Sequence, residues 1–62
     1  MSPNELRAAG ERLYGRRWHR PLAKALGVDR RTVDRWAIGQ ARISTATEMA
    51  IRTLIALRRP SE

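Results

Sequence analysis

Cysteine is absent from this 62-residue chain, and histidine occurs once. The chain can therefore form neither disulfides nor thiolate metal sites, and one imidazole is too few for a zinc site. A paired nucleophile and base are also lacking, as is a glycine loop that could cradle a phosphate. We accordingly expect no enzymatic activity, no metal, no cofactor and no small-molecule ligand.

Long apolar segments are also missing. No apolar run approaches the roughly 18 residues that a membrane span requires, and no signal peptide is recognisable. We therefore expect a cytoplasmic protein that does not enter a membrane. A domain this small buries only about 60% of the surface that its unfolded chain exposes. Without disulfides or a metal, association with a second copy is the stabilising device that remains.

Positive charge is what the chain has in excess. It carries a net charge of +7, from 13 lysines and arginines against 6 aspartates and glutamates, and all but one of the 13 are arginine. Arginine forms forked hydrogen bonds with phosphates and base edges. The segment 16–42 holds eight basic residues against Asp29 and Asp34, so it carries +6 of the +7. Such a basic zone is typical of a surface that binds a polyanion, and a solvated cationic face is the alternative.

Apolar spacing and capping signals predict an all-α fold of four helices in a single domain, residues 1–62. The expected helices cover residues 3–14, 19–26, 30–38 and about 44–59. β-Branched residues nowhere alternate with polar ones over four positions, so no strand is expected. The side chains expected to face the core from the first three helices are Leu6, Ala9, Leu13, Leu22, Ala23, Leu26, Val33, Trp36 and Ala37.

Local signals mark the ends of these helices. Residues typical of helix starts are Ser2 with Glu5, Asp29, and Ser44 or Thr45, of which Thr45 would form a capping box with Glu48. Residues typical of helix ends are Gly15, Gly27, Gly39 and Pro60.

The predicted helices 19–26 and 30–38 are joined by only three residues, Gly27, Val28 and Asp29. A turn this tight packs the two helices together as one unit, with Val28 in the corner between them. The start of the second helix then lies at an outer corner of the domain. The side chains that would be able to enter the major groove of DNA from there are Arg30, Arg31, Thr32 and Arg35.

The segment PLAKALGVDRRTVDRWAIG, residues 21–39, resembles the helix-turn-helix of the Cro/C1-type (XRE-like) repressors of phages and mobile elements. The matching features are Leu22-Ala23, Leu26-Gly27-Val28, the polar cap Asp29, Thr32-Val33, Trp36 and Gly39. The resemblance implies that residues 30–38 are the recognition helix, docked in the major groove. By position, it implies base contacts for Arg30, Arg31 and Arg35, a base or phosphate contact for Thr32, and phosphate contacts for His19 and Arg20.

Other polar residues near this unit have two interpretations each. Arg16 and Arg17 are expected to contact the DNA backbone or to be solvated, and Arg42 is a further phosphate candidate. His19 is as consistent with a plain surface position as with a phosphate contact. Asp34 could accept a hydrogen bond from a cytosine amino group, but an intrahelical pair with Arg30 or Arg31 is favoured.

The two tryptophans are expected in the core. Trp36 follows Val33 by three residues, which is the spacing of one helix face and argues against stacking on a base. Trp18 lies between basic residues, where an exposed ring could stack on RNA, but packing over the first two helices is favoured.

The last predicted helix has more apolar residues than one face holds. We expect Ile51 and Ile55 to project from a second side of this helix, while the core is covered by Ala46, Met49, Ala50, Thr53, Leu54 and Leu57. The isoleucines indicate either a wide buried face or a dimer interface, and we favour an interface formed by Ile51, Leu54, Ile55 and Leu57.

The function that the sequence favours is a homodimeric transcriptional regulator that binds double-stranded DNA. In its simplest form it would be a repressor that occludes a promoter at a palindromic operator. Two alternatives stay open. One is a module that binds the acidic surface of a partner protein, and the other is a cationic RNA or nonspecific nucleic-acid binder.

Overall fold

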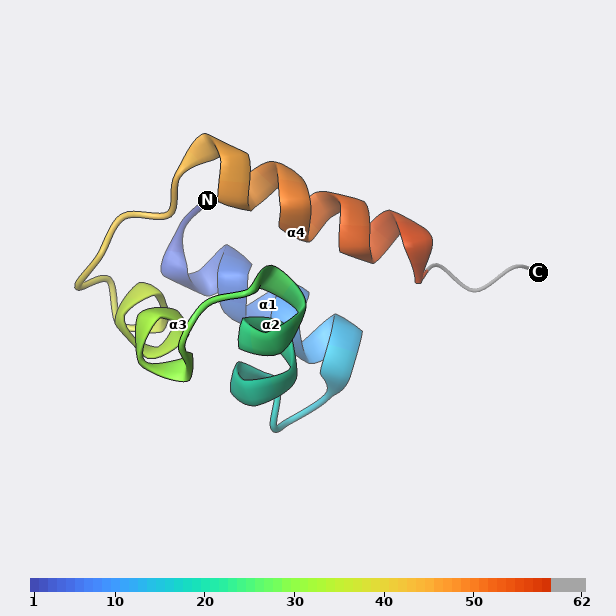
Figure 1. The fold of residues 1–62 in the computed structure, drawn as a ribbon, viewed down its shortest axis with the longest axis horizontal. Coiled ribbons are helices and arrows are strands. Elements are labelled where there is room, and N and C mark those ends of the chain that lie inside the picture. Colours follow the sequence, from blue (N-terminus) through green and yellow to red (C-terminus); the bar gives the residue numbers. More distant parts are fainter. Residues whose placement is uncertain (59–62) are drawn as a thin grey trace.

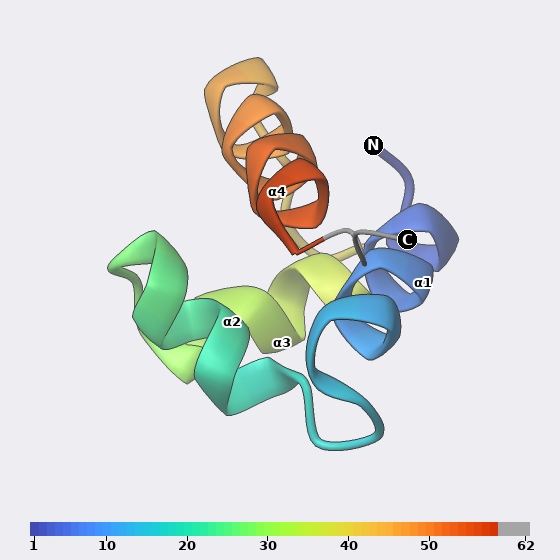
Figure 2. The ribbon, with the colours of Figure 1, turned by 90° about the vertical axis from the view of Figure 1, so that its right-hand side faces the viewer.

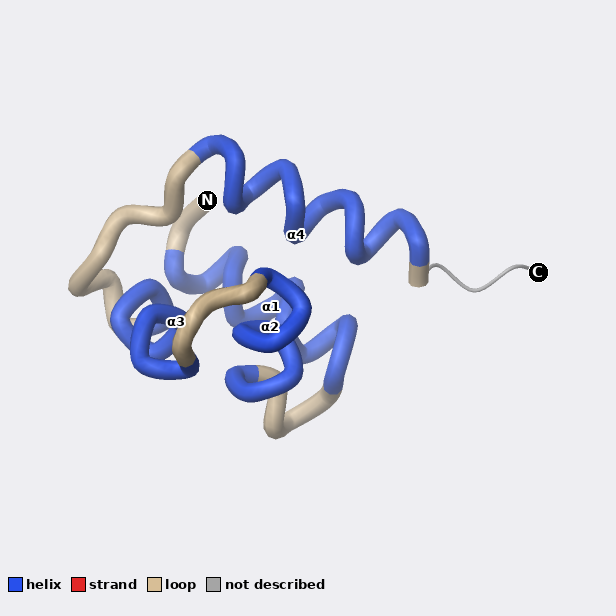
Figure 3. The backbone as a smooth tube through the Cα atoms, in the orientation of Figure 1, coloured by secondary structure: helices blue, strands red, loops and turns tan. Residues whose placement is uncertain are grey.

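The computed structural model describes residues 1–58, which form four α-helices and no strand (Figure 1, Figure 3). The helices are α1 (Pro3–Tyr14), α2 (His19–Leu26), α3 (Arg30–Ala37) and α4 (Thr45–Leu57). The predicted all-α fold of four helices is therefore confirmed. The expected continuation of the last helix to about residue 59, and its stop at Pro60, lie outside the described residues. None of the four helices has the length and apolar character needed to cross a bilayer.

Capping explains where α1 begins and where α2 ends. The Ser2 hydroxyl accepts a hydrogen bond from the Glu5 backbone amide at 3.1 Å, and the Glu5 carboxylate accepts one from the Ser2 amide at 2.8 Å, which confirms the predicted capping box. At the end of α2, Gly27 is left-handed with φ 74°, and the Val28 amide donates to the Ala23 carbonyl at 3.0 Å. This turn satisfies carbonyls at the end of the helix and favours glycine.

The starts of α3 and α4 differ from the prediction in detail. Asp29 is the N-cap of α3, but its side chain makes no capping hydrogen bond. At α4 the cap is Ser44, which accepts a hydrogen bond from the Thr47 amide at 3.1 Å. The Thr45–Glu48 box is wrong, because Thr45 is already inside the helix and the Glu48 carboxylate has other partners.

Those partners tie α4 to the start of the chain. The Glu48 carboxylate accepts hydrogen bonds from the Arg52 guanidinium at 2.8 Å and from the N-terminal amine of Met1 at 3.1 Å. These two bonds hold the pKa of Glu48 below its ordinary value, and the bond from Arg52 has the larger effect. At the other end of α4, the Arg58 guanidinium lies 5.3 Å from the centre of the Tyr14 ring.

The core lies where α1, α2 and α3 meet under α4 (Figure 2). The predicted inward positions of α1 and α3 are all buried, and on α2 Leu22 and Ala23 are buried while Leu26 is half-buried. Trp18 and Trp36 are also in the core, 3% and 7% exposed, as expected. Trp18 packs onto Gly10, where an added Cβ would lie only 2.3 Å from the indole ring. Ile43, in the link before α4, joins this core without having been predicted.

α4 buries a different side from the predicted one. Ile51 is 0% exposed, and Leu54 and Ile55 are half-buried against the core. The side chains that were expected to cover the core, Ala46, Met49, Ala50 and Thr53, are exposed, as is Leu57. The predicted core stripe is therefore wrong, and Ile51 cannot belong to a dimer interface because its own chain covers it. Apolar residues surround most of this helix, so their spacing alone does not select one face.

Candidate nucleic-acid interface

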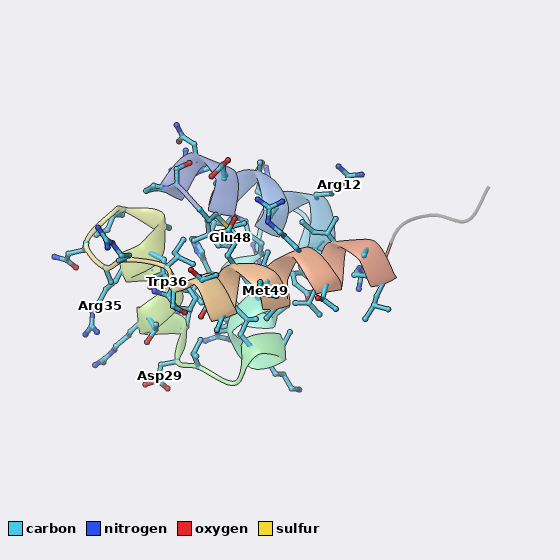
Figure 4. The ribbon with its side chains drawn as sticks, turned by 90° about the horizontal axis from the view of Figure 1, so that it is seen from above. Arg12, Asp29, Arg35, Trp36, Glu48 and Met49 are labelled. Carbon is cyan, nitrogen blue, oxygen red and sulfur yellow. The ribbon has the colours of Figure 1, made fainter. Side chains whose placement is uncertain are left out.

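α3 presents an arginine-rich face to solvent. Val33, Trp36 and Ala37 are buried on one side of the helix, which turns Arg30, Arg31 and Arg35 outward. The predicted exposure of these three arginines is confirmed, whereas Thr32 is half-buried at the edge of the packed side. In Figure 4, Arg35 projects from the edge of the molecule, on the same side as Asp29 at the start of α3.

Two adjoining clefts connect this face with the start of α2. One cleft is lined by Arg20, Asp29, Arg30 and Arg31, and the other by Arg16, Arg17, His19, Arg20, Pro21 and Arg30. Arg20 and Arg30 line both clefts, so the two hollows form one continuous basic surface. Five arginines from the α1–α2 loop, α2 and α3 thus converge, and only one acidic side chain, Asp29, lines the clefts. Such a concentration of one charge attracts a polyanion.

The beginnings of α2 and α3 add backbone donors to this surface. The N-cap of α2 is Trp18 and that of α3 is Asp29, and neither side chain accepts a hydrogen bond from the first turn. The first amides of a helix lack partners within the helix, and the helix dipole places partial positive charge there. On α2 these donors are the amides of His19 and Arg20 alone, since Pro21 has no N–H. Together with the arginine side chains, these amides suit phosphate oxygens.

Asp34 is shared between two basic side chains from different helices. Its carboxylate lies 3.6 Å from Arg30 Nε, which confirms the favoured intrahelical pair, and 3.7 Å from His19 Nδ1. No acidic partner of His19 was predicted, because that partner, Asp34, lies on α3 and not close to His19 in the sequence. All three side chains are about half exposed, so each contact contributes at most about 1 kcal/mol. The His19 ring also lies against Trp18, with 3.9 Å between ring centres.

Arg42 lies apart from these clefts. It lines a separate hollow that also involves Met1, Trp36 and Gln40. Of the residues predicted to contact phosphate, the fold therefore gathers Arg16, Arg17, His19 and Arg20 around the start of α2, and leaves Arg42 outside that group.

Ile38 was not predicted to belong to the site. It caps α3 and is 73% exposed, and it follows Arg31 by seven residues and Asp34 by four. This spacing places it on the outer face of the helix with the arginines. The repeat 31, 34, 35, 38 was visible in the sequence, but an isoleucine at a helix end is normally expected to be buried.

Comparisons with models of protein families, with curated proteins and with solved structures gave no match to this chain. The chemistry of the arginine-rich surface is therefore the basis for a functional proposal.

Proposed function

We propose that this chain is a helix-turn-helix regulator that binds specific sequences of double-stranded DNA, with α3 in the major groove. The observation that carries the proposal is the continuity of the exposed arginines of α3 with the basic clefts at the start of α2. An α-helix with its side chains is about 10–12 Å across, and the major groove is about 12 Å wide. The recognition helix would thus fit within the groove.

The arginines divide into two roles by position. Arg30, Arg31 and Arg35 would reach base edges, where an arginine pairs best with the O6 and N7 atoms of guanine. Thr32, at the edge of the packed side, would contact a base or a phosphate. Phosphate contacts would fall to Arg16, Arg17, His19 and Arg20, with the first-turn amides of α2 beside them.

Double-stranded DNA is favoured over single-stranded RNA by the position of the aromatic residues. Tyr14, Trp18 and Trp36 are the chain's only aromatic residues of the phenylalanine, tyrosine and tryptophan types. Both tryptophans are buried, and only Tyr14 of the three is even partly exposed, so the chain offers little open aromatic surface of these types for base stacking. Single-strand binders rely on such stacking.

The regulatory effect would be repression in its simplest form, because occlusion of a promoter requires only binding.

The test begins with selection of binding sequences from a randomised DNA duplex library. Affinity is then measured for a selected duplex and a scrambled duplex, with Arg31→Ala, Arg35→Ala and the control Arg12→Ala. Arg12 projects from the opposite edge of the molecule from Arg35 (Figure 4). Each α3 variant should lose about 10- to 100-fold on the selected duplex, from about 1–3 kcal/mol per base contact, and far less on the scrambled one. Arg12→Ala should change both affinities little.

Salt dependence provides the second measurement. The logarithm of the association constant should fall steeply with the logarithm of salt concentration, because phosphate contacts release counterions. Equal losses on both duplexes would reduce the α3 arginines to phosphate contacts of a nonspecific binder. A failure to select any sequence, together with a flat salt dependence, would favour an acidic protein partner instead.

A further inference from the structure

The outer face of α4 is apolar along its whole length. The exposed residues on this face, here called the α4 outer face, are Ala46, Met49, Ala50, Thr53, Ala56 and Leu57. Met49 is 62% exposed and Leu57 is 77% exposed. Their spacing of three and four residues is that of one side of a helix. Solvent-facing sides of helices are normally polar, so this side has the composition of a contact surface.

No charge interrupts this face, and its single hydroxyl is already engaged. Thr53 Oγ1 donates a hydrogen bond to the Met49 carbonyl at 2.9 Å, which leaves the threonine methyl available for apolar contact. The nearest charged side chains on the helix, Glu48 and Arg52, lie beside the face and pair with each other at 2.8 Å. They therefore form a polar rim along an apolar strip.

We infer that the α4 outer face binds the same face of a second copy of the chain. Two copies that each carry a net charge of +7 repel one another over most of their surfaces. The α4 outer face is where they can meet without bringing positive charges together. Ala46, Ala50 and Thr53 are small enough for close approach of two helices, while Met49 and Leu57 supply apolar area. A two-fold axis lets each copy use the same residues.

The α4 outer face and the basic clefts do not overlap. α4 packs on α1 and α2, and within residues 1–58 its backbone does not lie against that of α3 (Figure 1). In Figure 4, Met49 lies on α4 in the middle of the view, away from Arg35 at the edge. A second copy on α4 would therefore leave α3 open to DNA. In this form the inference rests on the proposed function, because a pair of recognition helices would read the two halves of a palindromic site.

The pairing of single chains should be weak. Stable interfaces bury about 800 Å² per partner, and one face of a 13-residue helix offers considerably less. Association also costs translational and rotational freedom. The dimer should consequently form at high protein concentration in solution and at much lower concentration on a palindromic duplex, where DNA holds both copies close together.

Sedimentation equilibrium without DNA tests the pairing independently of any DNA sequence. The matched variants are Ala50→Glu on the α4 outer face and Ala8→Glu on the exposed side of α1, which make the same change of charge at two exposed helical alanines. The average mass of the wild type should rise with concentration from one chain toward two. Ala50→Glu should raise the dissociation constant at least about tenfold, because it places a charge in an apolar contact, and Ala8→Glu should not.

Salt distinguishes this association from DNA binding. Added salt screens the repulsion between copies and should strengthen the pairing, whereas it should weaken binding to DNA. A wild type that stays monomeric at every concentration, including in high salt, would overturn the inference. Equal dissociation of the two glutamate variants would also overturn it. Pairing without sequence-specific DNA binding would instead contradict only the proposed function.

Cross-linking gives an independent measurement, because the chain has no cysteine of its own. Ala50→Cys should oxidise to a covalent dimer much faster than Ala8→Cys at the same protein concentration. Equal rates for the two variants would contradict a contact through α4. Circular dichroism of all four variants separates a lost contact from a lost fold.

Discussion

The outer faces of α3 and α4 are both open to solvent, yet they differ completely in chemistry. α3 turns Arg30, Arg31 and Arg35 outward with Asp34, whereas the α4 outer face has no charged residue. A solvent-exposed helix face needs polar residues, but it does not need arginine in particular. The outer face of α3 therefore carries more positive charge than solvation requires, and the α4 outer face is less polar than a solvent-exposed helix face normally is. The two departures indicate two kinds of partner, a polyanion on one side and an apolar surface on the other.

The two helices also differ in how they are held. α3 buries three side chains among its eight residues but has no side-chain cap at its start. α4 is capped by the Ser44 hydroxyl, yet Ile51 is its only fully buried residue, and polar contacts at Glu48 and Arg58 help to attach it. α3 is thus held in place mainly by core packing. Polar contacts near the two ends of α4 help to hold that helix.

The largest expected effect comes from the core contact on which both faces depend. At an open helical position, glycine to alanine stabilises a protein by about 1 kcal/mol. Gly10→Ala should instead destabilise this one by about 2 kcal/mol or more, because the new Cβ would lie 2.3 Å from the Trp18 ring. Urea unfolding measures the change, with Ala8→Gly, which should cost about 1 kcal/mol, as the comparison. A stabilised Gly10→Ala protein would contradict the packing of Trp18 on α1.

Ile38 is an exception to the difference between the two faces, because it is an apolar side chain on the charged face of α3. If α3 enters the groove, Ile38 should contact a thymine methyl group when the selected site has one within reach. Replacing that thymine by uracil should weaken binding about fourfold, from about 0.8 kcal/mol for one buried methyl group. The loss should disappear in Ile38→Ala and persist in Arg12→Ala, which lies away from α3. If every thymine can be replaced without effect, Ile38 lies outside the contact.

Asp34→Asn would increase the difference in charge between the two faces, because it removes the carboxylate from the outer face of α3. The surface would become more positive, and affinity for the scrambled duplex should rise about threefold at low salt and less at high salt. Affinity for the selected duplex should rise by a similar factor if Asp34 serves mainly to pair with Arg30 and His19. A loss confined to the selected duplex would indicate instead that Asp34 accepts a hydrogen bond from a cytosine.

The smallest effect concerns the attachment of α4 at acidic pH. The hydrogen bonds from Arg52 and from the N-terminal amine lower the pKa of Glu48 below its ordinary 4.5. Their contribution to stability is therefore present above that ordinary value and is lost as the pH falls through the lower, folded value. Melting temperatures measured from neutral to acidic pH should fall less steeply for Glu48→Gln than for the wild type. Glu11→Gln on α1 is the control, and identical slopes for Glu48→Gln and wild type would contradict the prediction.

Much of the fold could be predicted because its signals are local. The capping box of Ser2 and Glu5 and the left-handed Gly27 act within a few residues, so they fixed the start of α1 and the end of α2. The inward face of α3 was also predictable, since its apolar residues occupy only one side of the helix. That pattern sends Arg30, Arg31 and Arg35 outward without knowledge of any other helix.

Contacts between residues from different segments of the chain could be learned only from the tertiary structure. It placed Asp34 beside His19, joined the two clefts through Arg20 and Arg30, and set Trp18 on Gly10. It also decided which side of α4 faces the core. The four helices and the arginine face of α3 could be predicted from local sequence, because a few neighbouring residues are enough to set a cap or an amphipathic pattern. Only packing could orient α4, because a helix that is apolar on most sides turns inward the side whose shape fits the core.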